Sequence, residues 1–181
     1  MRKINEIFYS LQGEGFHTGT PAVFIRFSGC NLKCSFCDTQ HEEGVLMSDE
    51  EILAEVNKYP AVMVILTGGE PSLWIDREFV DRLHQTGKYV CIETNGTHVV
   101  PDNMDWVTCS PKQGAKLHIT HMDEVKVVYE GQDINVYELL PAKHFFLQPC
   151  SGVNIKETVD CVMQHPKWRL SLQTHKLIDI Q

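Results

Sequence analysis

Short runs of apolar and β-branched residues recur along the chain, and several of them are apolar at nearly every position. Such runs are typical of strands buried on both faces, as in a parallel sheet, whereas half-exposed strands alternate apolar and polar residues. The runs cover residues 22–28, 61–66, 88–93, 106–109, 124–129, 143–147 and 168–173. We therefore expect a parallel sheet built mainly from these segments.

Amphipathic segments lie between the runs and predict helices. Residues 48–51 read Ser-Asp-Glu-Glu, a capping box that precedes an apolar stripe. Residues 76–85 carry apolar positions at helical spacing and are followed by Gly87, a residue that ends helices. A third helix start falls at residues 154–157.

Strands that alternate with helices indicate βαβ units. A closed eight-fold barrel typically takes ~250 residues, whereas this chain has 181. We therefore expect the α/β class, with a partial (open) parallel β/α barrel of about six strands. The barrel would occupy residues 1–181 as a single domain.

Polar motifs follow the predicted strands instead of preceding them. A cysteine loop spans residues 29–41, and shorter motifs cover residues 67–71, 94–96, 110–112 and 148–151. In parallel α/β folds, ligands bind at the carboxyl ends of the strands. The five motifs therefore predict one binding rim.

The cysteine loop carries the strongest chemical signal in the chain. Cys30, Cys34 and Cys37 follow the spacing Cys-x-x-x-Cys-x-x-Cys. Three thiolates can hold three irons of a [4Fe–4S] cluster, which leaves the fourth iron open to a small molecule. The alternative is a structural zinc site with His41 as fourth ligand, but such sites usually draw on a second Cys/His pair, and none has suitable spacing here.

Other residues at the rim have both a functional and a structural interpretation. Gly69 lets the backbone approach a ligand closely, and Glu70 either helps to bind it or caps the next helix. Arg26 lies near the end of a buried strand, where its guanidinium either binds a substrate carboxylate or forms an ion pair. Cys109 and Cys150 fall at strand ends, so either can line the pocket.

Composition narrows the class of protein. Hydrophobic residues make up 43% and charged residues 22%, and the formal charge of −8 argues against nucleic acid as a main partner. No apolar stretch approaches the ~20 residues that span a bilayer, and we expect neither a signal peptide nor a membrane. Seven cysteines, three of them on one loop, favour a metal site in a reducing, cytoplasmic compartment.

Taken together, the motifs resemble those of the radical S-adenosylmethionine (SAM) enzymes. Within that superfamily the chain closely resembles the 7-carboxy-7-deazaguanine synthase family, over nearly its whole length. The segments that carry the resemblance are residues 11–15 (Leu-Gln-Gly-Glu-Gly), 19–21, 24–26, 29–32, 37–39 (Cys-Asp-Thr), 67–71, 93–96, 110–112, 148–149 and 173–176.

The resemblance implies a reaction. The substrate would be 6-carboxy-5,6,7,8-tetrahydropterin and the products 7-carboxy-7-deazaguanine and ammonia, in 7-deazapurine (queuosine) biosynthesis. The enzyme would be a radical SAM carbon–nitrogen lyase, with a [4Fe–4S] cluster, SAM and Mg²⁺ as cofactors. SAM would be cleaved to a 5′-deoxyadenosyl radical and regenerated.

The resemblance also implies site residues. The cluster ligands would be Cys30, Cys34 and Cys37, and the magnesium ligand Thr39. The SAM contacts would be Gly69, Glu70, Ser110, Pro111, Lys112, Gln148, Pro149, Cys150 and Ser151. The substrate contacts would be Leu11, Gln12, Gly13, Arg26, Thr67 and Gln181.

The same resemblance predicts partners and a role for the end of the chain. A reducing electron donor such as flavodoxin or ferredoxin would act on the cluster, and the family is typically homodimeric. The terminal carboxylate of Gln181 would accept hydrogen bonds from the pterin, while Leu177, Ile178 and Ile180 would bury apolar groups and hold the tail in place.

Two other functions are compatible with the cysteine loop. An activating enzyme that makes a glycyl radical on a partner protein carries the same triad, but Leu-Gln-Gly-Glu-Gly and Arg26 favour a small carboxylated substrate. A [4Fe–4S] electron carrier would have no use for the Gly-Gly-Glu-Pro turn or for the motifs at the strand ends.

Overall fold

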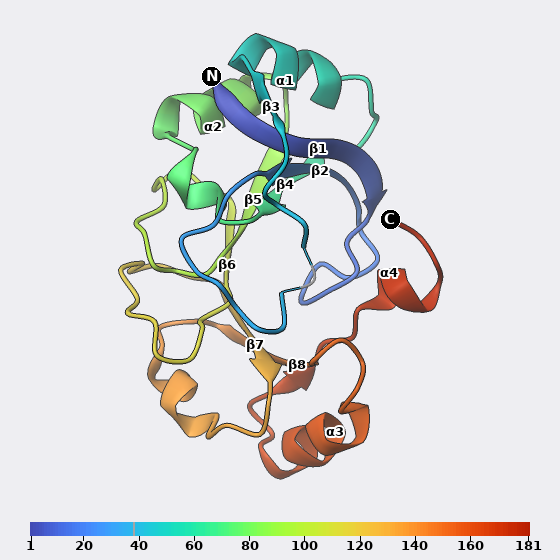
Figure 1. Cartoon of the computed structure of the whole chain (residues 1–181), viewed down its shortest axis with the longest axis vertical. Coiled ribbons are helices and arrows are strands. Elements are labelled where there is room, and N and C mark those ends of the chain that lie inside the picture. Colours follow the sequence, from blue (N-terminus) through green and yellow to red (C-terminus); the bar gives the residue numbers. More distant parts are fainter. Residues whose placement is uncertain (38) are drawn as a thin grey trace.

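One nine-stranded sheet runs through the whole chain (Figure 1). The computed structural model describes residues 1–37 and 39–181, so Asp38 of the Cys-Asp-Thr motif lies outside the described residues. The order across the sheet is β3-β1-β2-β4-β5-β6-β7-β8-β9. The strands are β1 (Arg2–Leu11), β2 (Pro21–Phe27), β3 (Val45–Met47), β4 (Met63–Gly68), β5 (Tyr89–Thr94), β6 (Trp106–Cys109), β7 (Glu124–Tyr129), β8 (His144–Pro149) and β9 (Arg169–Leu170).

Seven strands, β2 and β4 to β9, are parallel, which confirms the open α/β barrel. The terminal strands β3 and β9 lie at opposite edges and do not pair with each other, so the barrel is not closed. The last strand is only two residues long, shorter than the run at residues 168–173 that predicted it. Because parallel strands end at one edge, the five polar motifs do share one rim.

The sequence pattern missed β1 and β3. β1 runs antiparallel to β2, and β3 runs antiparallel to β1. β1 mixes polar residues into its apolar ones, and a register shift between Ile4 and Glu6 breaks its alternation. The consequence is functional, because β1 ends beside Pro21, at the opposite end of the sheet from the cysteine loop.

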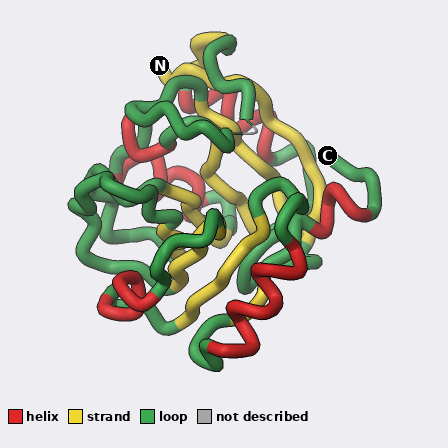
Figure 2. Tube along the Cα trace, turned by 60° about the horizontal axis from the view of Figure 1, so that its bottom comes forward, coloured by secondary structure: helices red, strands yellow, loops and turns green. Residues whose placement is uncertain are grey.

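Three helices cover one face of the sheet, which we call the outer face (Figure 2): α1 (Asp49–Val56), α2 (Arg77–Gln85) and α3 (Ile155–Gln164). The short α4 (Thr174–Leu177) packs instead against the loop after β1, and 3₁₀ turns lie at η1 (Pro71–Leu73) and η2 (Asn135–Leu139). The predicted capping box is present, because Ser48 Oγ accepts a hydrogen bond from the Glu51 backbone and Glu51 Oε2 accepts one from Ser48. None of the described helices is long and apolar enough to cross a membrane.

The third predicted helix begins as expected but is capped differently. The Asn154 side chain makes no cap hydrogen bond to α3. It accepts from the Cys150 backbone at 2.8 Å and donates to the Tyr129 carbonyl at 2.7 Å. Asn154 therefore ties the loop after β8 to the end of β7.

The two faces of the sheet differ in composition. Outer-face side chains such as Ile25, Leu66 and Ile92 are fully buried against the helices and form the main core. The opposite, inner face begins as a small apolar cluster around Phe24 and Ile65. Toward the carboxyl ends of the strands, the alternation of side chains places polar residues on the inner face, and these surround the candidate site.

Candidate active site

The cysteine loop lies at the carboxyl end of β2. Cys30 and Cys34 are half-buried and Cys37 is exposed, and all three are free thiols. Burial raises the pKa of the Cys30 thiol, and the neighbouring Glu70, Cys34 and Cys37 add to the rise, while a hydrogen bond from the Leu32 backbone opposes it. The Asn95 amide also lies 3.9 Å from Cys30 Sγ. Three thiols therefore gather on one short loop, with N–H donors beside the first of them.

The donor set fits a [4Fe–4S] cluster better than a single zinc ion. Among the residues that the structure describes, no three His, Cys, Asp or Glu side chains come close enough to share one metal ion. A [4Fe–4S] cluster takes its cysteine ligands on different iron atoms, so its thiolates stand farther apart. His41 instead serves the loop through its backbone, because its carbonyl accepts from Gly29 at 2.7 Å.

The Gly-Gly-Glu-Pro turn after β4 packs directly against the cysteine loop. A Cβ at Gly69 would lie 2.0 Å from the Gly29 carbonyl oxygen, which no side chain tolerates. The Glu70 backbone N–H donates to that same carbonyl at 2.9 Å. Glycine at position 69 is therefore required for the two rim loops to meet.

Glu70 acts as a connector in this structure. Its side chain is fully buried and accepts from Ser72 N at 3.0 Å, Thr94 Oγ1 at 2.7 Å and Asn95 N at 2.7 Å. These bonds cap the 3₁₀ turn η1 and join the ends of β4 and β5. A contact between residue 70 and a cofactor would therefore come from the backbone.

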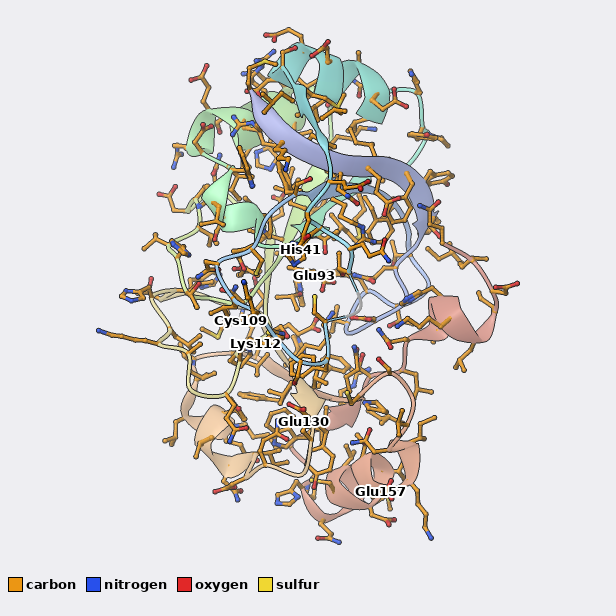
Figure 3. The ribbon with its side chains drawn as sticks, in the orientation of Figure 1. His41, Glu93, Cys109, Lys112, Glu130 and Glu157 are labelled. Atoms are coloured by element: carbon orange, nitrogen blue, oxygen red, sulfur yellow. The ribbon has the colours of Figure 1, made fainter. Side chains whose placement is uncertain are left out.

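The motif after β6 reaches back to the cysteine loop. Lys112 Nζ donates to Ser110 Oγ at 2.6 Å and lies 5.5 Å from the centre of the Phe36 ring. Burial lowers the pKa of Lys112 below its ordinary value. Pro111 is buried, so the motif presents the Lys112 ammonium group (labelled in Figure 3) to Phe36 of the cysteine loop.

The motif after β8 runs from a buried residue to an exposed one. Gln148 is buried, and its Oε1 accepts from Ser171 Oγ at 3.0 Å. Pro149 ends the strand, and Cys150 is half-buried. Ser151 is exposed and has a positive φ of 46°, a sharp turn of the backbone just past the strand.

The other strand-end cysteine does not line the pocket, contrary to the expectation for Cys109. It is fully buried in the outer-face core, and burial raises its pKa to about 12. Successive side chains of β6 point to opposite faces of the sheet, so Thr108, and not Cys109, lies on the inner face beside Glu124. One residue of register decides between core and pocket.

Arg26 and Thr67 lie side by side on the inner face, because they are partners in the β2–β4 register. Arg26 Nε donates to Glu6 Oε1 at 2.6 Å, so the ion-pair interpretation of Arg26 is correct for one edge of its guanidinium. No hydrogen bond is recorded for Nη1 and Nη2 within the described residues, and that edge can meet a carboxylate.

The end of the chain returns to β1 (Figure 1). Ser10 Oγ donates to the Gln181 backbone oxygen at 2.5 Å, and Gln181 Nε2 donates to Glu6 Oε2 at 2.7 Å. Glu6 therefore bonds to both Arg26 and Gln181, and links the end of the chain to the arginine. The expected burial of the tail is wrong for the single chain, because Leu177 and Ile178 are exposed and Ile180 is only partly covered.

The loop after β1 enters the site from the opposite end of the sheet. Leu11 ends the strand, and the buried Gln12 donates to Glu93 Oε1 at 2.7 Å. Gly13 packs against the ring of His175 so closely that a Cβ would lie 1.9 Å from Nδ1. The inner face is thus bounded by the cysteine loop at one end and by this loop at the other.

Thr39, the expected magnesium ligand, is half-buried just beyond the last cysteine. Its carbonyl accepts from Cys37 Sγ at 3.6 Å. Thr39 therefore lies beside the last of the three thiols.

The site contains charged residues that sequence reasoning did not assign. They are Glu6, Glu14, Glu93 and Lys126, of which Lys126 makes ion pairs with both Glu14 and Glu93. A signal was present in the sequence, because Lys126 lies between two valines in a run that predicted a buried strand. A lysine at such a position is almost never buried without a partner.

Comparison with known proteins places this architecture in a family. The family model of the radical SAM superfamily matches residues 24–107. A 7-carboxy-7-deazaguanine synthase from Bacteroides thetaiotaomicron is 82% identical, with 100% of both chains covered. The synthase of the same name from Burkholderia multivorans is 40% identical, with 98% of each chain covered.

A solved structure agrees in fold. The crystal structure of QueE from Escherichia coli superposes with a TM-score of 0.79 and 31% sequence identity, and the match covers 94% of this chain and 93% of that one. The chain therefore belongs to the 7-carboxy-7-deazaguanine synthase family of radical SAM enzymes.

Proposed function

We propose that this chain converts 6-carboxy-5,6,7,8-tetrahydropterin to 7-carboxy-7-deazaguanine and ammonia, in the biosynthesis of 7-deazapurines such as queuosine. One observation carries the proposal: in a member of this family, the open edge of Arg26 lies on the inner face next to the strand ends that hold the cysteine loop and the glycine turn. A carboxylate bound there would place the attached ring carbon close to the cofactors.

Cys30, Cys34 and Cys37 would hold the [4Fe–4S] cluster, and the rest of the rim would hold SAM. When bound, these cofactors supply the 5′-deoxyadenosyl radical that removes a hydrogen atom from the pterin. The rim residues that we assign to SAM are Gly69, Glu70, Ser110, Pro111, Lys112, Gln148, Pro149, Cys150 and Ser151. Their support is their place at one edge of the sheet, around the thiols.

The chain's own residues would bind and orient the pterin. Arg26 matches the carboxylate with two parallel N–H donors, and Thr67 beside it offers a hydroxyl. Gln12 and Gly13 approach from the far loop, with Leu11 as an apolar contact. Gln181 would cover the remaining side through its terminal carboxylate.

The experiment that tests the function is an anaerobic assay. Reconstituted protein, SAM, Mg²⁺ and a chemical reductant are mixed with the carboxy-tetrahydropterin, and products are identified by mass spectrometry. We expect 7-carboxy-7-deazaguanine and ammonia in equal amounts. Formation of 5′-deoxyadenosine without any change in the pterin would contradict the proposal and favour a glycyl-radical activating enzyme. A [4Fe–4S] electron carrier would produce no 5′-deoxyadenosine at all.

Magnesium would bind to the Thr39 hydroxyl and to substrate oxygens, because Mg²⁺ takes few protein ligands and keeps water and substrate in its octahedron. Thr39→Val should weaken the dependence of turnover on Mg²⁺ while iron content stays the same. Ser35→Ala is the matched control, since Ser35 offers an exposed hydroxyl on the same loop. An unchanged response of Thr39→Val to Mg²⁺ would refute the assignment.

The assembly and the reductant also belong to the proposal. A homodimer and a flavodoxin- or ferredoxin-type electron donor are supported by the family resemblance. Sedimentation that shows only monomer at micromolar concentration would contradict the first, and failure of both reduced donors to support turnover would contradict the second.

A further inference from the structure

A buried lysine lies beneath two carboxylates on the inner face. Lys126 Nζ is 2.6 Å from Glu14 Oε2 and 2.7 Å from Glu93 Oε2. The lysine side chain is only 4% exposed, whereas Glu14 and Glu93 keep 16% and 21% of their side chains exposed. The ammonium group is therefore sealed, whereas the two carboxylates keep a small part of their surface exposed (Glu93 is labelled in Figure 3).

Two amides complete the arrangement. Gln12 Nε2 donates to the other oxygen of Glu93 at 2.7 Å, and Gln173 Nε2 donates to the other oxygen of Glu14 at 2.8 Å. Each of the four carboxylate oxygens thus has one protein donor and retains further acceptor capacity. We call Gln12, Glu14, Glu93, Lys126 and Gln173 the acceptor network.

The acceptor network joins parts of the chain that are far apart. It links the loop after β1, the end of β5, the middle of β7 and the segment after β9. β1 and β9 lie toward opposite edges of the sheet and β5 and β7 lie between them, so the network ties both sides of the sheet to its middle. The carboxylates cannot turn away from the site without losing bonds to several elements at once.

Electrostatics explains why a lysine is needed. Burial alone would raise the pKa of Glu14, but the charge of Lys126 and its hydrogen bond outweigh burial and lower that pKa below its usual value. The other charged groups near Lys126 and Glu14 are Glu124, Lys112 and His175. Burial raises the pKa of Glu124 to about 7, which shows what happens to an inner-face carboxyl that has no direct bond to the lysine.

We propose that Lys126 is a positioning residue that holds the Glu14 and Glu93 carboxylates in place as two hydrogen-bond acceptors, and so selects a substrate ring whose edge presents N–H donors. This inference deepens the proposed function, because the aminopyrimidinone edge of a pterin has neighbouring N–H groups. An ionised carboxylate only accepts hydrogen bonds, and a protonated one donates as well. A ring that presented a carbonyl there would meet a second acceptor and leave both groups unpaired.

A purely structural role would also explain a buried ion network, and the two roles differ in their dependence on pH. Without the lysine charge, burial should raise the pKa of Glu14, so that this carboxyl takes up a proton more readily. In that variant the protonated carboxyl would no longer act only as a hydrogen-bond acceptor at low pH, and it would do so again at high pH. A structural defect would weaken binding equally at every pH.

The test measures binding of a probe and does not depend on turnover. 6-Carboxypterin carries the 2-amino donor, and 6-carboxylumazine has a carbonyl in its place. Binding of each to the reconstituted enzyme is measured by equilibrium dialysis from pH 6 to pH 8.5. We expect the wild type to prefer 6-carboxypterin by about 10-fold or more at every pH.

In Lys126→Met the preference for 6-carboxypterin should be about 10-fold lower than in the wild type at pH 6, and part of it should return at pH 8.5. Lys126→Arg keeps the charge and should keep the preference at all pH values. Lys156→Met, an exposed lysine on α3, is the control for the substitution itself. Equal preference in Lys126→Met and wild type, or a loss that is the same at every pH, would overturn the proposal.

Folding is checked first by circular dichroism and iron content. If Lys126→Met does not fold, Glu93→Gln replaces one acceptor by a neutral amide of the same shape, and a preference unchanged from wild type would then overturn the proposal. A wild type that binds 6-carboxypterin selectively but does not turn over the carboxy-tetrahydropterin would refute the proposed function and leave this inference standing. A wild type without preference would refute the inference even if turnover is normal.

Discussion

The cysteine loop, residues 29–41, and the acceptor network serve the same site but are built in opposite ways. The loop takes its three thiols from eight consecutive residues, and the last of these thiols is exposed. The network takes its five members from four distant segments and gives every carboxylate oxygen a donor. One region is local and half-exposed, and the other is long-range and largely buried.

The difference teaches how each region should respond to change. A cofactor can organise a loop when it binds, because metal–ligand bonds themselves hold the ligands in place. A recognition surface without a metal must be held by the protein itself, through buried hydrogen bonds and charge. We therefore expect chemistry to fail when the loop is altered and selectivity to fail when the network is altered.

The largest effect should come from the loop. Cys34→Ala removes one of three cluster ligands, and we expect loss of both SAM cleavage and product formation, with iron falling well below the about four per chain of a [4Fe–4S] site. Iron, sulfide and 5′-deoxyadenosine are measured on anaerobically purified protein. Cys161→Ala, a half-buried cysteine on α3, is the control and should keep its iron. Stoichiometric zinc without iron in the wild type would remove the basis of the comparison.

The next effect tests how closely the loop must be placed. Gly69→Ala would push a methyl group against the Gly29 carbonyl, since a Cβ there lies 2.0 Å from that oxygen. A misplacement of about 1 Å at a reacting centre can cost ~100-fold in rate, and we expect a loss of that order in turnover. The measurement is kcat/KM at full iron loading.

Gly131→Ala is the control for this prediction. Gly131 has a φ of +88° but open space around it, so alanine there should cost about 1 kcal/mol of stability and leave catalysis alone. Full activity of Gly69→Ala would mean that the loop adapts and that its position is not set by the glycine turn.

A smaller effect is expected at the end of the chain, where Gln181 contacts Ser10 and Glu6. A short extension after Gln181 removes the terminal carboxylate and crowds Ser10 and Glu6. We expect KM for the carboxy-tetrahydropterin to rise by about 10-fold with cluster assembly unaffected. Gln181→Ala loses only the side-chain bond to Glu6 and should change KM by less than about 3-fold. Normal turnover of the extended enzyme at low substrate would exclude the contact.

The smallest effect is a pH dependence of stability next to the network. Glu124 has a pKa of about 7 because burial disfavours its charged form. The unfolded chain has the ordinary lower pKa, so the folded state binds more protons between the two values and loses stability as pH rises through about 7. We expect the wild type to lose about 1 kcal/mol between pH 6 and pH 8 through this group.

Urea unfolding of wild type and Glu124→Gln at both pH values measures this effect. The glutamine variant should lack the pH-dependent loss, whereas Glu157→Gln, at an exposed position on α3, should behave like the wild type. The same loss in Glu124→Gln and wild type would show that Glu124 is not the responsible group.

Much of the fold followed from the pattern of apolar runs. Every run predicted as a strand pairs in the sheet, and three helices begin at or within one residue of the predicted caps. β1 and β3 were missed, because an antiparallel edge strand with mixed polarity and a bulge has neither a continuous apolar run nor a clean alternation. Without β1, nothing in the sequence indicated which end of the sheet residues 11–13 approach.

The sequence by itself determined the cysteine loop, the glycine turn and the shared rim, because each of these depends on neighbouring residues and on the rule that parallel strands end at one edge. Only the tertiary structure decided which distant charges meet. Lys126 lies between two valines in the run at residues 124–129. Nothing near it in sequence shows that carboxylate oxygens of Glu14 and Glu93 will lie within 3 Å of its Nζ atom. The same holds for Cys109, which the register turns into the core, and for Glu6, which joins Arg26 to the end of the chain. Side-chain chemistry is local, but the pairing of buried charges depends on strand order and register, and these are settled by the whole sheet.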